Sequence, residues 1–208
     1  MKRLMATAAV LGVLATAAGA HTWLVRRGSA CPMGHASPES LESARAPALQ
    51  AVRGTATVEA PTRIAMGFAL DRTTQSELLA TASARKGICA EEADGALVRC
   101  TFADREELVA RFTPQHVLVG LDRVRYGLDG ETAAKELGRV RAAQVVTYGA
   151  PHRQWGEATA AYLGSPLRQT GVEYRFSDLL IDVTATQMAQ DGVVLREQVR
   201  SVPVGPRG

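Results

Sequence analysis

Apolar and polar residues alternate in several segments in the last two thirds of the chain. This period of two is typical of strands in an antiparallel sheet that has one buried and one solvated face. Asp94-Gly95, between two of these segments, is a strong signal for a tight hairpin turn. The expected strands span 68–70, 88–91, 97–102, 108–112, 117–125, 172–176, 179–184 and 193–202.

A helix is predicted from about Thr74 to Lys86, directly after the first expected strand. Thr74 followed by Glu77 is the pattern of a capping box, in which each side chain binds the backbone of the other residue. Gly87 suits the end of this helix, because glycine readily adopts the left-handed conformation found there.

The segment 68–79 has a counterpart in 126–137. Both contain an aromatic residue, then Leu-Asp, then a Thr three positions after the Asp, and then a helical run that ends in Leu. In the second segment Asp129 is expected to cap a helix over about 131–146, which Gly149 and Pro151 end.

Further pairs of similar segments indicate an internal duplication. They match 99–102 with 173–176 and 117–125 with 193–200. We therefore predict an α+β fold of two related units, about 63–125 and 126–202, with 203–208 as a tail. Each unit is a helix followed by a β-meander, and both helices pack on one face of a shared antiparallel sheet.

The N-terminus has the pattern of a secretory signal. Met1-Lys2-Arg3 precedes an apolar run from Leu4 to Val25, and Ala18-Gly19-Ala20 offers a cleavage site. The run is also long enough to be an uncleaved anchor that contacts the membrane through residues 4–25. Both alternatives for residues 1–25 predict a periplasmic or other extracytoplasmic location, with attachment to the inner membrane if the segment is retained.

Residues 26–62 are expected to form a flexible tether. The segment contains Pro32, Pro38, Pro47 and Pro61 and is rich in Ala, Ser and Glu. It has no strong apolar periodicity that would bury one face, although a short helix around 39–45 fits the pattern.

Cys89 and Cys100 lie symmetrically about Asp94-Gly95. A two-residue hairpin at that turn places them opposite each other on neighbouring strands, within reach of a disulfide bond. An oxidising compartment outside the cytosol favours the bond. Closing this loop is expected to stabilise the fold by roughly 3 kcal/mol.

Cys31-Pro32-Met33-Gly34-His35 is the most unusual short sequence in the chain. Thiolate, thioether and imidazole are ligands that suit copper(I), so Cys31, Met33 and His35 form a candidate metal site. A Cys-Pro pair is also found as a haem ligand. Against both functions, a flexible linker does not preorganise a site. Lipidation of Cys31 is disfavoured, because Arg26-Arg27 separates it from the apolar run.

Charge and motifs exclude several functions. Lys and Arg number 24 against 21 for Asp and Glu, and no basic face interleaved with aromatic residues occurs, so nucleic acid is not an expected partner. The nucleophile elbow Gly-x-Ser-x-Gly, the zinc motif His-Glu-x-x-His, the phosphate-binding loop and the dinucleotide fingerprint are all missing from the sequence. We expect no catalytic residue and no cofactor.

The longest expected loop, 150–170, contains His152, Arg153 and Trp155. An imidazole, a guanidinium and an indole in an exposed loop are typical of a surface that binds another protein. We therefore treat these residues as a candidate partner-binding loop.

The repeated helix and meander in a secreted chain resembles the β-lactamase-inhibitor-protein-like fold, of which small lipoproteins of the outer-membrane assembly machinery use a single unit. The similar motifs are Leu-Asp-x-x-Thr before each helix and Tyr148-Gly149-Ala150-Pro151 after the second, within about 63–202. The resemblance implies a protein that binds another envelope protein and is not an enzyme.

Overall fold

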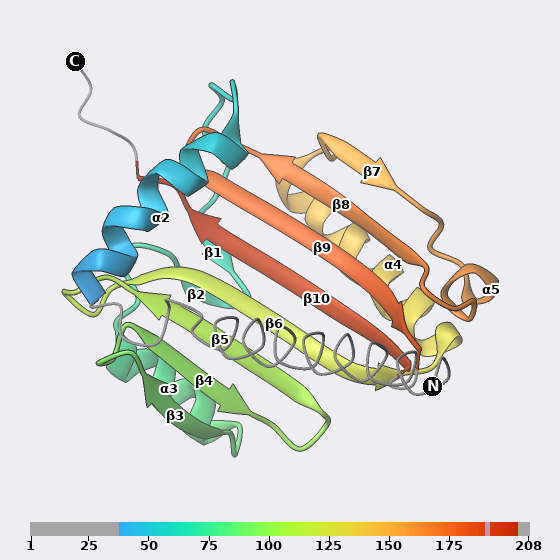
Figure 1. The fold of residues 1–208 in the computed structure, drawn as a ribbon, viewed down its shortest axis with the longest axis horizontal. Helices are drawn as coiled ribbons and strands as arrows, with labels where there is room; N and C mark the ends of the chain where they lie inside the picture. Colours follow the sequence, from blue (N-terminus) through green and yellow to red (C-terminus); the bar gives the residue numbers. More distant parts are fainter. Residues whose placement is uncertain (1–37, 190–191, 204–208) are drawn as a thin grey trace, which may run out of the picture. The chain divides into compact units, whose positions relative to one another are not determined.

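The computed structural model describes residues 38–189 and 192–203, and its centre is an eight-stranded antiparallel sheet (Figure 1). The strand order is β3-β4-β5-β6-β10-β9-β8-β7. The strands are β3 (Ile88–Glu92), β4 (Leu97–Thr101), β5 (Glu106–Phe112), β6 (Leu118–Leu128), β7 (Arg153–Trp155), β8 (Gln169–Arg175), β9 (Leu179–Met188) and β10 (Gly192–Ser201). The predicted α+β class with a large antiparallel sheet is confirmed.

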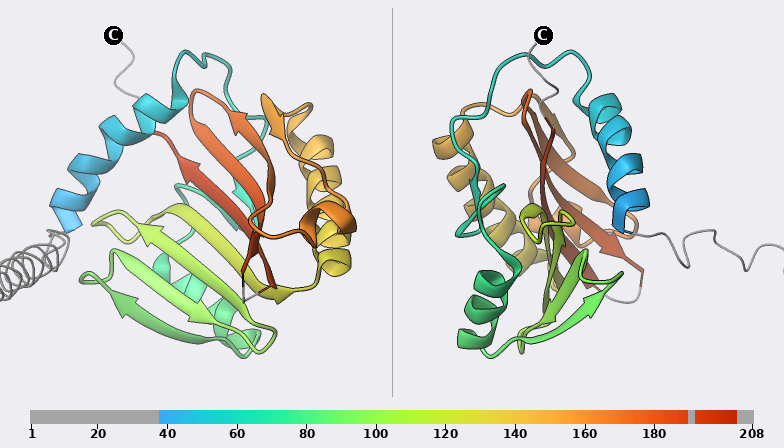
Figure 2. Two further views of the ribbon diagram at one scale, coloured as in Figure 1. Left: turned by 45° about the vertical axis from the view of Figure 1, so that its right-hand side comes forward. Right: turned by 90° about the vertical axis from the view of Figure 1, so that its left-hand side faces the viewer.

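Helices cover both faces of the sheet. Helices α3 (Gln75–Ala84) and α4 (Gly130–Tyr148) lie on one face, and α2 (Pro38–Arg53) lies on the other (Figure 2). The main core lies between the sheet and the helices α3 and α4, where Leu78 and Leu137 are fully buried. We call the opposite side of the sheet the α2 face.

Alternation along the strands separates the two faces. Ile181 and Val183 of β9 belong to the main core. Asp182 and Thr184, which alternate with them along the strand, point to the α2 face. The same period of two puts Val193, Leu195 and Val199 of β10 beneath α3 and α4, and its Arg and Gln side chains, together with Val194, on the α2 face. The predicted division into a buried face and a polar face therefore holds for the long strands.

The order of the strands is the same on both sides of the centre. Strands β3 to β6 follow one another from one edge of the sheet to its centre, and β7 to β10 do the same from the other edge. At the centre β6 pairs with β10. Each set follows its own helix, α3 or α4. In the central pair Gln198 lies opposite Asp122, and the register shifts once, between Val193 and Leu195.

The predicted helix caps are confirmed. Thr74 and Glu77 form the capping box of α3, with the Thr74 N–H donating to Glu77 Oε2 at 2.7 Å. Asp129 caps α4 by accepting from the Thr132 N–H at 2.8 Å. The two capping residues do not occupy matching positions in the repeated motif. Asp71, which corresponds to Asp129, is not a helix cap but lies in a turn and accepts a hydrogen bond from the Ser201 hydroxyl at 2.9 Å.

The end of α3 differs from the expectation. Lys86, and not Gly87, has the left-handed conformation, with φ 60°. Gly87 is needed for a different reason, since a Cβ there would lie 2.5 Å from the ring of Phe102. The glycine therefore permits close packing of the helix end against the sheet.

The hairpin between β3 and β4 forms as predicted. Asp94 and Gly95 both have positive φ, and the Ala96 N–H donates to the Ala93 carbonyl at 3.0 Å to close the turn. This register pairs Cys89 with Cys100, and the two form a disulfide. The bond ties the edge strand β3 to the rest of the sheet.

Several short elements are not in the predicted set. The expected loop 150–170 contains β7 and a one-turn helix, α5 (Ala160–Leu163). The expected first strand forms a separate two-stranded sheet of β1 (Ile64–Ala65) and β2 (Phe68–Ala69). Such pieces are too short to show a period in the sequence.

Part of the expected tether is folded against the sheet. Helix α2 is longer than the short helix predicted there, and its Leu49 is buried with Leu180 and Val202 on the α2 face. Further along, the backbone N–H of Ala60 donates to Asp178 Oδ1 at 2.8 Å. The expected signal or anchor, 1–25, lies outside the described residues. No helix in the described part of the chain is long and apolar enough to cross a membrane.

Candidate functional site

The α2 face contains a hollow of about 540 Å³ that extends across the sheet from β4 to β8. Helix α2 lies over one end of the face, and none of its described side chains lines the hollow. The side chains and backbone around it come from Leu97, Arg99, Glu107, Val109, Arg111, Asp122, Val124, Tyr126, Gln169, Thr184, Thr186, Met188, Val194 and Arg196.

Some apolar and aromatic side chains of the hollow are buried in its floor, and others are exposed to solvent. Val109 and Val124, on neighbouring strands, are buried, whereas Tyr126 and Met188 are 40% and 42% exposed. Partial burial, and then the carboxylate of Glu107, raise the pKa of the Tyr126 phenol. The phenol is therefore a neutral hydrogen-bond donor beside an accessible apolar surface.

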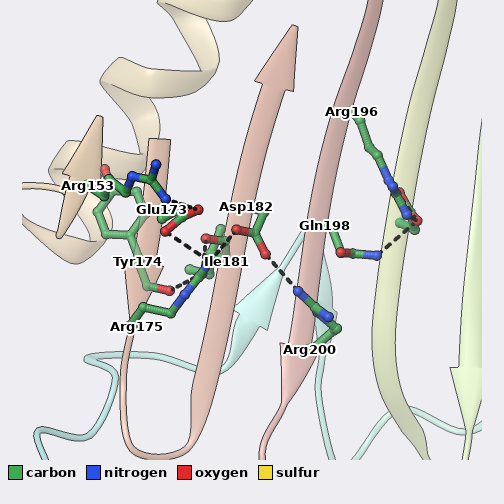
Figure 3. A network of polar contacts seen from close by, with 10 residues as sticks. Arg153, Glu173, Tyr174, Arg175, Ile181, Asp182, Arg196, Gln198 and Arg200 are labelled. Carbon is green, nitrogen blue, oxygen red and sulfur yellow. Dashed lines mark hydrogen bonds and ion pairs between the residues drawn. The ribbon is translucent and has the colours of Figure 1, made fainter. Parts of the chain in front are cut away.

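A buried carboxylate lies at the centre of the sheet. The single Nε–H of Arg196 is shared between the two carboxylate oxygens of Asp122 of β6, at 2.8 and 3.0 Å, and Arg196 Nη2 donates to Asp122 Oδ2. Gln198 Nε2 donates to the same carboxylate at 3.1 Å (Figure 3). The bonds to Asp122 raise the pKa of Arg196. Asp122 is thus fully engaged by groups of the neighbouring strand.

A second set of charges extends from β7 to β10. Asp182 accepts from Arg175 Nη2 at 2.7 Å and from Arg200 Nη2 at 2.8 Å. Glu173 lies 3.2 Å from Arg175 and 3.7 Å from Arg153 (Figure 3). Each carboxylate therefore lies between two guanidinium groups, and the side chains hold one another in place.

Arg111 of β5 is an exception within this pattern. Its Nη1 is buried and has no hydrogen-bond partner among the residues that the structure describes. Burial lowers the pKa of Arg111, and so do the charges of Arg196, Arg200 and Arg45, whereas Asp122 raises it. The positive charge of Arg111 is therefore poorly compensated by the described residues around it.

The structure separates the residues of the candidate partner-binding loop. Arg153 joins the charges of the α2 face and lies with its guanidinium 5.4 Å from the Trp155 ring centre. Trp155 lies over Gly171, where a Cβ would come within 2.3 Å of the indole. His152 instead packs edge-on against Phe176 of the main core, at 5.4 Å between ring centres, and its Nδ1 accepts from the Arg175 N–H. Only Arg153 and Trp155 therefore belong to the α2 face.

The candidate metal ligands Cys31, Met33 and His35 lie outside the described residues. Within 38–189 and 192–203, no group of three or more His, Cys, Asp or Glu side chains could hold a metal ion.

The hollow and its charges were not predicted from the sequence. The alternating pattern already placed polar residues such as Asp122, Arg196 and Arg200 on a solvated face. Their partners depend on which strands pair and in which register, and β6 and β10 are 74 residues apart at the Asp122–Arg196 contact. A prediction that the last strands of the two units pair would have brought these residues together.

No family model, curated protein or solved structure matches this chain. The resemblance to the β-lactamase-inhibitor-protein-like fold therefore stays an expectation from the sequence.

Proposed function

We propose that this protein is a non-catalytic binding module of the bacterial cell envelope, and that it holds another envelope protein on its α2 face. The observation that carries this proposal is the hollow, where Tyr126 and Met188 are exposed beside buried valines and Arg196. Aromatic residues, Met and Arg are enriched where proteins bind one another, and a few such residues dominate the affinity.

The surroundings of the hollow favour binding of a folded partner. The strands beneath it belong to one sheet, and the ion pairs of Asp122 and Asp182 fix the long Arg side chains beside it. A surface whose side chains are already ordered loses less conformational entropy on binding. Arg153 and Trp155 extend the proposed surface to the edge strand β7.

The envelope location rests on the sequence and on the disulfide. Residues 1–25 have the pattern of a signal peptide or an anchor, which would contact the membrane through residues 4–25 if retained. The Cys89–Cys100 bond fits an oxidising compartment outside the cytosol.

The proposed module is an internal duplication with units 63–125 and 126–202. Its support is the shared order of one helix and four strands, α3 with β3 to β6 and α4 with β7 to β10. Both helices lie on the same face, and the last strands of the two units pair at the centre. This arrangement agrees with the resemblance to the β-lactamase-inhibitor-protein-like fold, whose implied function is protein binding.

The test is affinity capture from the envelope fraction with the full-length protein as bait. Tyr126→Ala and Met188→Ala remove exposed side chains of the hollow and should abolish capture of a specific partner. Val146→Ala is the matched control, since Val146 is 88% exposed on α4, which covers the opposite face. Equal capture by all three variants would contradict the proposed surface.

A further inference from the structure

A side chain is missing between two arginines of the α2 face. Gly120 of β6 pairs with Arg111 of β5 on one side and with Arg200 of β10 on the other. A Cβ on Gly120 would lie 3.7 Å from Arg111 Cβ and 3.8 Å from Arg200 Cγ. The two arginine stems therefore flank a gap one side chain wide, next to the hollow that Arg111 lines.

Both arginines have buried donors without an acceptor. Arg111 Nη1 and Arg200 Nε are each buried and have no hydrogen-bond partner among the described residues. A buried N–H that has lost water and gained no partner is unfavourable, more so when it belongs to a charged group. A ligand that accepts these hydrogen bonds would remove that penalty.

The nearby carboxylates are already used. Asp122 is bound by Arg196 and Gln198, and Asp182 by Arg175 and Arg200 Nη2. Neither makes a hydrogen bond or a close ion pair with Arg111 in the described structure. Asp122 contributes only a longer-range attraction to that guanidinium.

A third guanidinium approaches from α2. Arg45 Nη2 donates to the carbonyls of Val119 and Ser201, which neighbour Gly120 and Arg200 in sequence, at 3.2 and 2.5 Å. Its charge acts on Arg111 together with those of Arg196 and Arg200.

We propose that the gap over Gly120 receives a carboxylate group. On the proposed function, that group belongs to an Asp or Glu side chain of the partner protein bound at the hollow. Arg111 Nη1 and Arg200 Nε can each donate to one oxygen of such a carboxylate.

The first test supplies the carboxylate from the chain itself. A side chain at position 120 fits, because the nearest atom to its Cβ would be 3.5 Å away. Gly120→Asp should pair with Arg111 and Arg200, whereas Gly120→Asn has the same shape without the charge. We expect Gly120→Asp to melt higher than Gly120→Asn by at least about 2–4 °C at neutral pH. Removing the guanidinium with Arg111→Gln should abolish the difference.

A Gly120→Asp variant that melts at or below Gly120→Asn would overturn the proposal. Comparing two substitutions of nearly equal size removes the effect of placing any side chain in the strand. Circular dichroism of both variants at room temperature checks that the comparison is made between folded proteins.

The second test measures binding of a free carboxylate. Acetyl-glutamate amide and inorganic phosphate are titrated at constant ionic strength into the full-length protein, and the arginine Nε–H signals are followed by NMR. We expect saturable shifts of Arg111 and Arg200 with the glutamate probe and binding about tenfold weaker in Arg111→Gln, equal to about 1.4 kcal/mol. The control Arg72→Gln removes the same charge from an exposed arginine elsewhere and should bind normally.

Two results would overturn the assignment, namely no saturable shift with glutamate, or tighter binding of phosphate at the same signals. Neither test uses the partner protein. A negative result in these tests therefore does not contradict partner binding at the hollow. A negative capture experiment likewise does not contradict carboxylate binding at the gap.

Discussion

Asp122 and Arg196 form a bidentate ion pair that joins the central strands β6 and β10, although the residues are 74 positions apart in the chain. The carboxylate is almost fully buried, whereas the guanidinium is about half exposed. Both residues line the hollow, and Asp122 also exerts a longer-range attraction on Arg111. A single contact therefore links the pairing of the two strand sets to the charge of the proposed binding surface.

Replacing Arg196 with Met is expected to destabilise the protein by about 2 kcal/mol. Gln198 would remain as the hydrogen-bond donor to a buried charge, and the loss is smaller than for a fully buried pair because water reaches the guanidinium. Urea unfolding measures the effect. The double variant Asp122→Asn with Arg196→Met should be more stable than the sum of the two single changes predicts. Additive losses would show that the pair contributes no coupling.

The disulfide should contribute about 3 kcal/mol, which corresponds to a fall in Tm of about 6–12 °C when it is removed. Cys89→Ala with Cys100→Ala is the suitable variant, since Cys100 is buried and a hydroxyl there would be unfavourable. Thermal unfolding with and without a reductant gives a second measurement. Cys31→Ala is the control, because Cys31 is not part of this bond and its removal should leave the reductant effect unchanged.

The sequence predicts those features that depend on neighbours in the chain. Thr74 and Asp129 cap the helices, and Asp94-Gly95 forms the turn that aligns the cysteines. The alternation along β9 and β10 correctly predicts which residues face the core. These features follow from local backbone geometry and from the period of two.

Features that depend on distant contacts were not predictable in the same way. Helix α2 has little apolar periodicity and is held by Arg45 and Leu49 against strands more than a hundred residues further on. Strand β7 is only three residues long, and its position depends on Trp155 fitting over Gly171. The unpartnered donors of Arg111 and Arg200 become visible only once three strands are aligned across Gly120.

The stabilising effect of Asp129 should depend on pH. Hydrogen bonds from the backbone and side chain of Thr132 lower the pKa of Asp129 below its ordinary value of 3.8. A lowered pKa in the folded state means that the stabilisation is complete above the unfolded pKa and is lost as the pH falls through the folded pKa. Asp129→Ala should therefore melt below the wild type at neutral pH, and the difference should shrink at pH about 2.5.

Asp129→Asn separates the cap from the charge. Asn also accepts the Thr132 N–H but does not titrate as a carboxylate, so its stability should lack the acid-dependent part. Thermal unfolding of the three proteins across the acidic range is the measurement. A difference between wild type and Asp129→Ala that does not change with pH would show that the Asp129 carboxylate contributes nothing as a charged cap.

Two glycines should respond in opposite ways to substitution by alanine. Gly138 is exposed within α4 and a Cβ there meets no atom within 4 Å, so Gly138→Ala should stabilise the protein by about 0.5–1 kcal/mol. At Gly171 the new methyl group would lie 2.3 Å from the Trp155 ring and 2.8 Å from the Val183 carbonyl. Gly171→Ala should therefore destabilise by about 1–3 kcal/mol, because the indole must leave its place over the strand.

Urea unfolding measures both alanine variants, and tryptophan fluorescence adds a local signal for Gly171→Ala. Displacement of Trp155 should shift the emission of the folded protein toward that of a solvated indole, whereas Gly138→Ala should leave the emission unchanged. Combining Gly171→Ala with Trp155→Ala removes the indole that the new methyl group would meet, so Gly171→Ala should destabilise the protein less in that background than it does alone. An equal cost in both backgrounds would mean that the carbonyl of Val183, and not the indole, is what excludes a side chain at position 171.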